Sequence, residues 1–308
     1  MNIVITGSSG FVGSKIIGQW MDRGHHISAV DAMSSPHLRP SGSFRFIQAD
    51  STRPGDWQNS VSDADAVVNL IGKNIFTRWT DDAKQQIHDS RVLSTRNIVD
   101  ALPHKTSATL INASAPAYYG HRGDDILDES QGPSQGNEFL AGVCAHWEAE
   151  ALAARKKGAR VVLARFGVIL GGSGGALSQM IPAFRMFAGG PIGNGRQWFP
   201  WIQIDDLVGA IDFILKNSAL DGPVNLCSPH PARNQDFAKA LGAALRRPSF
   251  LKTPAFMVRM GAGEMGDLLL HSHRMVPSRL LEAGYEFKYP NLPEALAASI
   301  KKPESLSA

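Results

Sequence analysis

Three glycines near the start of the chain are spaced so that the backbone could close around a phosphate group. Gly7, Gly10 and Gly13 lie in ITGSSGFVGSK, between an apolar run and a helical pattern. Glycine permits a tight turn and a close approach of the backbone, and the N-terminus of the following helix attracts an anion. The spacing is G-x-x-G-x-x-G rather than G-x-G-x-x-G, but it stands where a dinucleotide-binding turn belongs, at the start of a βαβ unit. The predicted cofactor contacts in this turn are Gly7, Ser8, Ser9, Gly10, Phe11, Val12 and Gly13.

A carboxylate at the end of the next apolar run could bind a ribose. Asp31 closes HISAVD, at the distance from the glycines that dinucleotide-binding folds use. There it would accept hydrogen bonds from both ribose hydroxyls and repel a 2′-phosphate, so we predict NAD as the cofactor, with NADP as the alternative. With NADP, a nearby cation such as Arg39 would have to receive the phosphate. The competing interpretation of Asp31 is a strand-end aspartate that begins a turn before AMSSP.

Short apolar runs alternate with helical patterns along the first half of the chain, the order that places parallel strands in one sheet. The runs are NIVIT, HISAV, FRFIQ, DAVVNLIG, ATLINAS and RVVLARFG. They show little polar alternation, as expected of strands covered on both faces by crossover helices. We therefore predict an α/β fold with a Rossmann-type, doubly wound parallel sheet. The second half is less regular, and GGSGGA and AGGPIGNGRQWFPW precede a helical segment at about 205–216.

Length, charge and cysteine content exclude several classes of protein. A chain of 308 residues with 43% hydrophobic content can bury a sizeable core, and a net charge of +3 spread along it does not indicate a nucleic-acid partner. Cys144 and Cys227 have no metal-ligand spacing and suggest no disulfide, so we expect no metal site and a reducing compartment. MNIVITG enters a strand pattern directly and no apolar run is long enough for a bilayer, which predicts a cytoplasmic protein without membrane insertion. No pattern encodes the oligomeric state, and a homo-oligomer is compatible with the sequence.

Several motifs together resemble a known superfamily. They are TGSSGFVG, the strand-end Asp31, Asp50 after the third run, NLIG at 69–72, and SAPAYYG. This set is similar to the extended short-chain dehydrogenases/reductases, in the branch of the sugar-nucleotide epimerases and dehydratases. Longer stretches, such as RWTDDAKQQIHDSRVLSTRNIV and RMVPSRLLEAGYEFKYPNLPEAL, resemble an atypical epimerase-like subgroup with its own C-terminal segment. The resemblance covers nearly the whole chain.

The resemblance implies a division of the chain and further cofactor contacts. It implies a dinucleotide-binding Rossmann domain at 1–165 with a returning segment at about 203–222. The remaining 166–202 and 223–308 would form a smaller α+β substrate domain. It also implies NAD(P) as the cofactor and adds Asp50, Leu70, Ile71 and Gly72 to the residues that contact it.

The catalytic pair of that superfamily is missing from this sequence. Working members use Tyr-x-x-x-Lys on a helix, where the lysine holds the nicotinamide ribose and lowers the pKa of the tyrosine. An unperturbed tyrosine, with a pKa of about 10, is a poor base at neutral pH. Alignment on Glu129 and Glu148 places the pair at Leu140 and Cys144, and FLAGVCAHWEAEA contains neither tyrosine nor lysine.

Four side chains near the fifth apolar run are candidates for the missing chemistry. Ser114 lies where the family has a substrate-orienting hydroxyl, although a strand-end serine bonded to the backbone is the alternative. Tyr118 and Tyr119 belong to the Y-G turn, and we predict that they shape the pocket and that neither is the activated phenol. Histidine is the residue type whose unperturbed pKa lies closest to neutrality, so His121 could be an acid or base, or else a surface loop histidine. Lys73, after the fourth run, is the remaining candidate for a fixed cation.

The expected substrate site departs from that of sugar-nucleotide enzymes. The arginine that grips the diphosphate in those enzymes is replaced by Phe199 in RQWFPWIQIDD, and Arg196 is its candidate substitute. Trp198 and Phe199 would either form an apolar pocket wall or pack the domain junction. Loss of a planar fork of donors disfavours a phosphate-bearing substrate.

Two functions fit these features. One is an NAD(P)-dependent oxidoreductase or epimerase-like enzyme with a rearranged acid and base, acting on a small molecule. The other is a non-catalytic dinucleotide-binding regulatory module. We favour the enzyme because hydride chemistry belongs to the cofactor and the protein mainly positions it.

Overall fold

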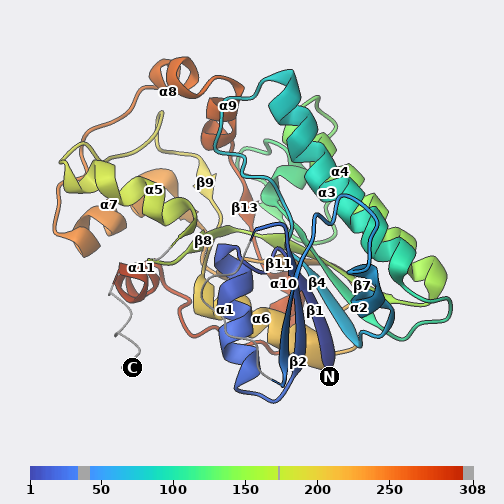
Figure 1. Cartoon of the computed structure of the whole chain (residues 1–308). Helices are drawn as coiled ribbons and strands as arrows, with labels where there is room; N and C mark the ends of the chain where they lie inside the picture. The colour runs from blue at the N-terminus through green and yellow to red at the C-terminus, as the bar shows by residue number, and fades with distance from the viewer. Residues whose placement is uncertain (34–41, 173, 301–308) are drawn as a thin grey trace.

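One seven-stranded sheet, in which every neighbouring pair of strands is parallel, forms the centre of the fold. The computed structural model describes residues 1–33, 42–172 and 174–300, and its strand order is β11-β7-β5-β4-β1-β2-β3 (Figure 1). The strands are β1 (Asn2–Thr6), β2 (His26–Asp31), β3 (Phe44–Gln48), β4 (Ala66–Asn69), β5 (Thr109–Ser114), β7 (Arg160–Phe166) and β11 (Gly222–Leu226). Each predicted apolar run forms one of these strands, so the doubly wound parallel sheet is confirmed. Arg39 lies outside the described residues.

The chain reverses its direction of winding beside β1. Strands β2 and β3 lie on one side of β1, and β4 and β5 lie on the other. Thr6 and Asn69 pair at the ends of β1 and β4, and the Thr6 hydroxyl donates to Asn69 Oδ1 at 2.8 Å. Open parallel sheets bind ligands outside the carboxyl ends of the strands at such a switch point. The glycine turn that follows Thr6 therefore begins at this point.

Helices cover both faces of the sheet. On one face, α1 (Phe11–Met21) and α6 (Ile204–Lys216) bury Trp20 and Ile211 against the strands. On the other face, α2 (Gln58–Ser62), α3 (Asp81–Ala101) and α4 (Phe139–Leu152) share a second apolar core. Figure 1 shows α1 and α6 on one side of the sheet and α3 and α4 on the other. No helix of the described chain is both long and apolar enough to cross a bilayer.

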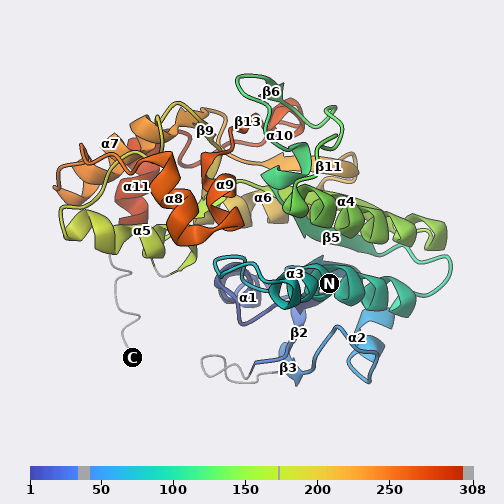
Figure 2. The ribbon, with the colours of Figure 1, turned by 90° about the horizontal axis from the view of Figure 1, so that it is seen from above.

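The other elements form a smaller layer with a core of its own. Helices α5 (Gly175–Arg185), α7 (Asn234–Leu245) and α11 (Leu292–Ile300) enclose this core. The remaining elements are β6 (Ile126–Leu127), β8 (Val168–Leu170), β9 (Trp198–Phe199), β10 (Trp201–Gln203), β12 (Ala232–Arg233), β13 (Arg274–Met275), α8 (Ala255–Ala262), α9 (Glu264–Leu270), α10 (Ser278–Glu282), and the 3-10 turns η1 (Pro116–Tyr119) and η2 (Ala153–Lys157). Figure 2 shows α5, α7, α8, α9 and α11 grouped apart from α2 and β3. We propose that this layer is the substrate part. Because β11 joins the large sheet, we propose that the returning segment, predicted at about 203–222, includes β11 to residue 226.

Two glycines of the turn after β1 leave no room for a side chain. Gly7 has a φ of +71°, and a Cβ there would lie 2.9 Å from the carbonyl carbon of Leu70. A Cβ on Gly13 would lie 2.6 Å from the carbonyl oxygen of Gly7 and 2.8 Å from Ser8 Cα. The strand, the turn and the helix therefore pack backbone against backbone, which requires glycine at both positions.

We expect Gly13→Ala to lower the free energy of unfolding by about 1–3 kcal/mol, because the added methyl group must displace backbone atoms. The matched control is Gly18→Ala on the exposed side of the same helix, where a Cβ meets nothing within 4 Å. This control should raise the free energy of unfolding by about 0.5–1 kcal/mol, since alanine is the better helix former. Urea unfolding followed by circular dichroism measures both changes. An unaltered stability of Gly13→Ala would contradict the close packing.

Candidate dinucleotide and substrate site

A cavity of about 380 Å³ lies at the carboxyl ends of β1, β4 and β5. The glycine turn and the loop after β4 form one part of its wall, and α3 and α4 form another. The predicted cofactor contacts that line it are Gly7, Gly10, Phe11, Val12, Gly13, Leu70, Ile71 and Gly72. The structure therefore brings two separate predicted segments together around one space, with the backbone approach that a pyrophosphate requires.

The other predicted cofactor residues, Ser8, Ser9, Asp31 and Asp50, do not line the cavity. The hydroxyl groups of Ser8 and Ser9 are buried and have no hydrogen-bond partner among the described residues. Buried hydroxyls are normally paired, so orphan hydroxyls fit a turn that a ligand's oxygen atoms complete. Asp31 lies against the turn, and its carboxylate accepts from the Ser9 N–H at 2.9 Å. Asp50 accepts from the N–H and the hydroxyl of Thr52 at 3.0 and 2.7 Å, which holds its carboxylate in a local turn.

A chain of buried polar groups engages two of the predicted catalytic residues. Arg165 forms a bidentate ion pair with Glu148, with Nε to Oε1 at 2.9 Å and Nη2 to Oε2 at 2.8 Å. Ser114 Oγ donates to the same Oε1 at 2.6 Å. Arg165 Nη1 donates to the Tyr119 hydroxyl at 2.8 Å, and that hydroxyl donates to Asn225 Oδ1 at 2.8 Å. The hydroxyls of Ser114 and Tyr119 are therefore bonded to protein groups, although Ser114 still lines the cavity.

The environment of both tyrosines disfavours the phenolate. Burial raises the pKa of the Tyr119 hydroxyl well above its ordinary value. Burial, and then the charge of Glu148, raise the pKa of Tyr118. The Tyr118 ring stacks on the Arg165 guanidinium, whose Cζ is 3.7 Å from the ring centroid. Neither tyrosine lines the cavity, which supports the interpretation that both fill space.

His121 and Lys73 are both exposed and do not line the cavity. His121 Nδ1 accepts from the Ser272 N–H at 3.1 Å, so the ring is bound to the C-terminal segment. The structure does not bring either side chain to the cofactor space. Leu140 and Cys144, at the positions of the missing pair, do line it. Burial raises the pKa of the Cys144 thiol to about 12, so this position supplies a neutral group.

Arg91 of α3 is a residue of the cavity wall that the sequence did not single out. Its guanidinium packs against Gly72, where a Cβ would lie 2.7 Å from Nη2. Nη1 donates to the carbonyl oxygens of Lys73 at 3.2 Å and Ile87 at 3.0 Å, and Cζ lies 5.3 Å from the Trp147 ring. Burial lowers the pKa of Arg91, and within the described chain it forms no ion pair. The sequence does contain one indication: Arg91 lies four residues after the apolar Ile87, which places both on the same face of a helix.

A second, apolar cavity of about 200 Å³ adjoins the first. The two share the wall residues Ile75, Ala115, Ala117, Leu140 and Phe166. None of the described residues that line the second cavity is Asp, Glu, Lys or Arg. A ligand in this cavity would therefore lie directly beside a ligand in the first.

The predicted substrate residues divide between wall and surface. Trp198 and Phe199 line the apolar cavity, which favours the pocket-wall interpretation of these rings. The Trp198 Nε1 donates to Asp124 at 2.7 Å, which fixes the indole. Arg196 is exposed and does not line the cavity, so the structure does not place it as a phosphate-binding substitute.

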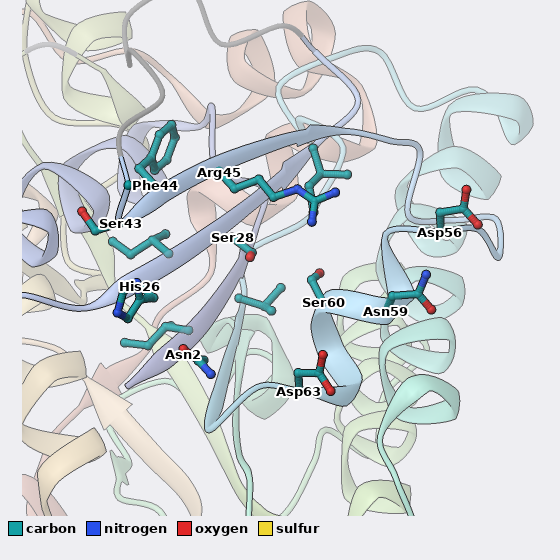
Figure 3. A pocket seen from close by; sticks show the side chains of 15 residues that line it. Asn2, His26, Ser28, Ser43, Phe44, Arg45, Asp56, Asn59, Ser60 and Asp63 are labelled. Carbon is teal, nitrogen blue, oxygen red and sulfur yellow. The ribbon is translucent and has the colours of Figure 1, made fainter.

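A larger cavity of about 610 Å³ lies elsewhere on the sheet (Figure 3). It is lined by residues at the beginnings of β1, β2 and β3, including Asn2, His26 and Arg45. The amino ends of parallel strands are opposite to the edge at which these sheets bind dinucleotides. Its size therefore does not make it the cofactor site.

Removing the hydroxyl of Tyr119 tests whether that group is structural. We expect Tyr119→Phe to lower the free energy of unfolding by about 1–3 kcal/mol, because Arg165 Nη1 then loses a buried acceptor. The matched Tyr118→Phe keeps the ring on Arg165 and should cost less. In a turnover assay both variants should keep most of their activity. A loss in kcat above about a hundredfold for either one, with fold and cofactor affinity intact, is the size expected for a general acid and would overturn the structural assignment.

Comparisons with known proteins agree with this geometry. An epimerase family protein SDR39U1 homolog, chloroplastic, of Arabidopsis thaliana is 38% identical over 304 residues, covering 97% of this chain and 86% of the relative. An epimerase family protein of Mycobacterium bovis is 38% identical and covers 98% of each chain. The human epimerase family protein SDR39U1, solved with NADPH, is 29% identical with a TM-score of 0.84 and covers 97% of this chain and 99% of that one.

Two family models account for most of the sequence. Residues 253–299 match DUF1731, a domain of unknown function. Residues 3–227 match the NAD dependent epimerase/dehydratase family. This match covers more than half of the chain and includes the glycine turn, the cavity and all of the parallel sheet except Asn2. The protein therefore belongs to the NAD dependent epimerase/dehydratase family, in an atypical form that ends in a DUF1731 segment.

Proposed function

We propose that the protein binds NAD(P) in the 380 Å³ cavity and catalyses hydride transfer to or from an uncharged small molecule in the adjoining cavity. The glycine turn, the orphan hydroxyls of Ser8 and Ser9, and the shared wall of the two cavities support this function. The human relative was solved with NADPH, which supports a nicotinamide dinucleotide as the ligand.

The observation that carries the proposal is the unpaired guanidinium of Arg91 in the cavity wall. A partly buried cation without a carboxylate is costly unless a ligand or water supplies the negative atoms. Among the described residues that line the cavity, Arg91 is the one with a permanent charge. A dinucleotide offers ribose and phosphate oxygens that this guanidinium can bind.

Arg91 takes the place of the missing lysine in this proposal. Cys144 and Trp147 line the same cavity on α4, and the Arg91 charge lowers the pKa of the Cys144 thiol against the larger effect of burial. The fixed cation therefore comes from α3 instead of from α4. Nη2 and Nε donate to no group of the described chain and are free to bind the hydroxyls of the nicotinamide ribose.

The chemistry of the site then divides between cofactor and protein. A bound nicotinamide supplies or accepts the hydride. The turn residues hold the pyrophosphate, and Arg91 orients the ribose. Because a guanidinium stays protonated at any ordinary pH, Arg91 positions oxygen atoms and does not exchange protons.

The alternative is a non-catalytic module that senses the cofactor. Two observations favour it: the Ser114 hydroxyl donates to Glu148, and neither Tyr118 nor Tyr119 lines the cavity. The two functions predict the same cofactor binding, because both need the dinucleotide. They differ in one outcome: the enzyme would oxidise NAD(P)H when a suitable small ketone is supplied as the hydride acceptor, and the module would not.

Fragments of the cofactor test the assignment of Arg91. We expect Arg91→Met to weaken the dinucleotide and ADP-ribose by about 10- to 100-fold, the size of a lost charge-assisted bond, and to leave ADP within about threefold. Calorimetry measures the dissociation constants. If NADP binds more tightly than NAD, the two fragments also carry the 2′-phosphate on the adenosine. The matched control is Arg96→Met on the same helix, where Arg96 is exposed and paired with Glu150 at 2.5 Å. An equal loss for ADP would place Arg91 on the pyrophosphate and contradict the ribose assignment, and a wild type that binds no dinucleotide would contradict the proposed function itself.

Asp31 tests the choice between NAD and NADP. We expect wild type to bind NAD more tightly and Asp31→Asn to narrow the difference, because the amide keeps the acceptor for the Ser9 N–H but no longer repels a 2′-phosphate. Calorimetry with both cofactors measures the ratio of dissociation constants. If wild type already prefers NADP, the role assigned to Asp31 is wrong and Arg39 becomes the first residue to substitute.

A further inference from the structure

We propose that the apolar cavity binds an uncharged, mostly hydrocarbon molecule whose hydroxyl group donates to Nε2 of His273. Such a molecule would be the substrate of the proposed hydride transfer. Its role as substrate rests on the proposed function, whereas its binding in the cavity does not. His273 lies between α9 and β13 and lines the cavity. It belongs to the segment that matches DUF1731.

The walls of the cavity exclude charged ligands. Its rings and aliphatic side chains include Phe76, Met180, Trp198, Phe199 and Leu268. With no charged side chain among the described residues of the wall, a phosphate or carboxylate would lose its hydration without gaining a cationic partner. An apolar cavity of about 150 Å³ can hold benzene, so a cavity of this size suits a somewhat larger hydrocarbon.

Two of the polar side chains in the wall form hydrogen bonds to backbone groups of the protein. Gln197 Nε2 donates to the carbonyl oxygens of Ile192 at 3.1 Å and Leu269 at 3.3 Å. Asn234 Oδ1 accepts from the Ile192 N–H at 2.8 Å. These bonds hold the loop around Ile192 in place. Besides these bonded atoms, the polar groups of these side chains and of the rest of the wall include Gln197 Oε1, Asn234 Nδ2 and the two histidines, His271 and His273.

His273 has a ring nitrogen that no described residue satisfies. The side chain is 5% exposed, and its Nε2 is buried without a hydrogen-bond partner. The imidazole lies beside the backbone of Gly120, which raises its pKa against the larger effect of burial. The His273 N–H also donates to the Trp198 carbonyl at 3.1 Å. We infer that Nδ1 donates to the Gly120 backbone and carries the proton, which leaves a lone pair on the unpartnered Nε2.

The imidazole stays neutral at physiological pH. Burial, and then the charges of the nearby His271 and His121, lower the pKa of His273 to about 3, while Glu138 opposes them. A neutral ring with its proton on Nδ1 can only accept at Nε2, so the ligand must supply the hydrogen. This requirement selects a hydroxyl over a carboxylate, a phosphate or an ether.

The C-terminal segment gains a function from this arrangement. Leu268, Leu269, His271 and His273 all lie within the part of the chain that matches DUF1731, and all line the apolar cavity. The other side of the cavity comes from the parallel sheet and its loops, including Ala115 and Phe166. The segment thus completes a pocket that the sheet leaves open and contributes its hydrogen-bond acceptor.

A pair of matched probes tests the proposal. Naphthol can donate through its hydroxyl, and its methyl ether keeps the rings without a donor. Calorimetry on the full chain, saturated with the cofactor it binds, should show that wild type prefers naphthol by about tenfold, the worth of one buried hydrogen bond. His273→Asn keeps an amide at the position of Nδ1 but has nothing at Nε2, so the preference should fall to about onefold. His273→Gln can place an oxygen near Nε2 and should restore part of it.

The controls separate this inference from the proposed function. Melting temperature and cofactor affinity are measured for each variant, and both should stay close to wild type. The His271→Asn variant should keep the preference for naphthol over its ether. If it loses this preference as His273→Asn does, the acceptor is not specifically His273 and the assignment is wrong. The wild-type preference should be constant between pH 8 and 5, whereas an acceptor with an ordinary histidine pKa of about 6.5 would lose it over this range. Equal binding of naphthol and its ether by wild type would overturn the proposal and leave cofactor binding unaffected.

Discussion

The bidentate ion pair between Arg165 and Glu148 is the interaction on which the rest of the site depends. Both side chains are buried, and a buried charge without its partner costs several kcal/mol, so β7 and α4 are held in one relative position. Ser114 and Tyr119 extend the pair to β5 and η1, and Asn225 extends it to β11. The carboxyl ends of three neighbouring strands are thereby tied to the helix that forms a wall of the cofactor cavity.

This network explains why two hydroxyl groups of types often used in catalysis are instead bonded within the protein. Ser114 and Tyr119 look reactive by residue type, but their hydroxyls satisfy the buried pair. The cation of the cavity comes instead from Arg91, which packs against Gly72 and the Trp147 ring. Positive charge is thus placed where a dinucleotide would lie, while the adjoining cavity has uncharged walls. In the proposed function, the contrast between the two walls would separate a polar cofactor from an apolar substrate.

The two cavities also assign different tasks to the two parts of the chain. The parallel sheet supplies the glycine turn and the loop after β4, which are backbone surfaces suited to a pyrophosphate. The smaller layer supplies side chains, with Trp198 and Phe199 from β9 and His273 from the segment before β13. A variable set of side chains on a constant backbone site is the way in which one fold serves different substrates.

The sequence by itself determined the strands, the parallel sheet and the glycine turn. These features are local, because apolar runs, helical periodicity and the conformational freedom of Gly7 can each be identified within a few neighbouring residues. The departures at Leu140, Cys144 and Phe199 were also identifiable, and the structure places all three in cavity walls. Only the tertiary structure decided that Ser114 and Tyr119 bond to protein groups, that Arg91 lines the cofactor cavity, and that His273 lies beside Gly120. These contacts join residues far apart in the sequence, and they depend on how helices and strands pack, which no local pattern encodes.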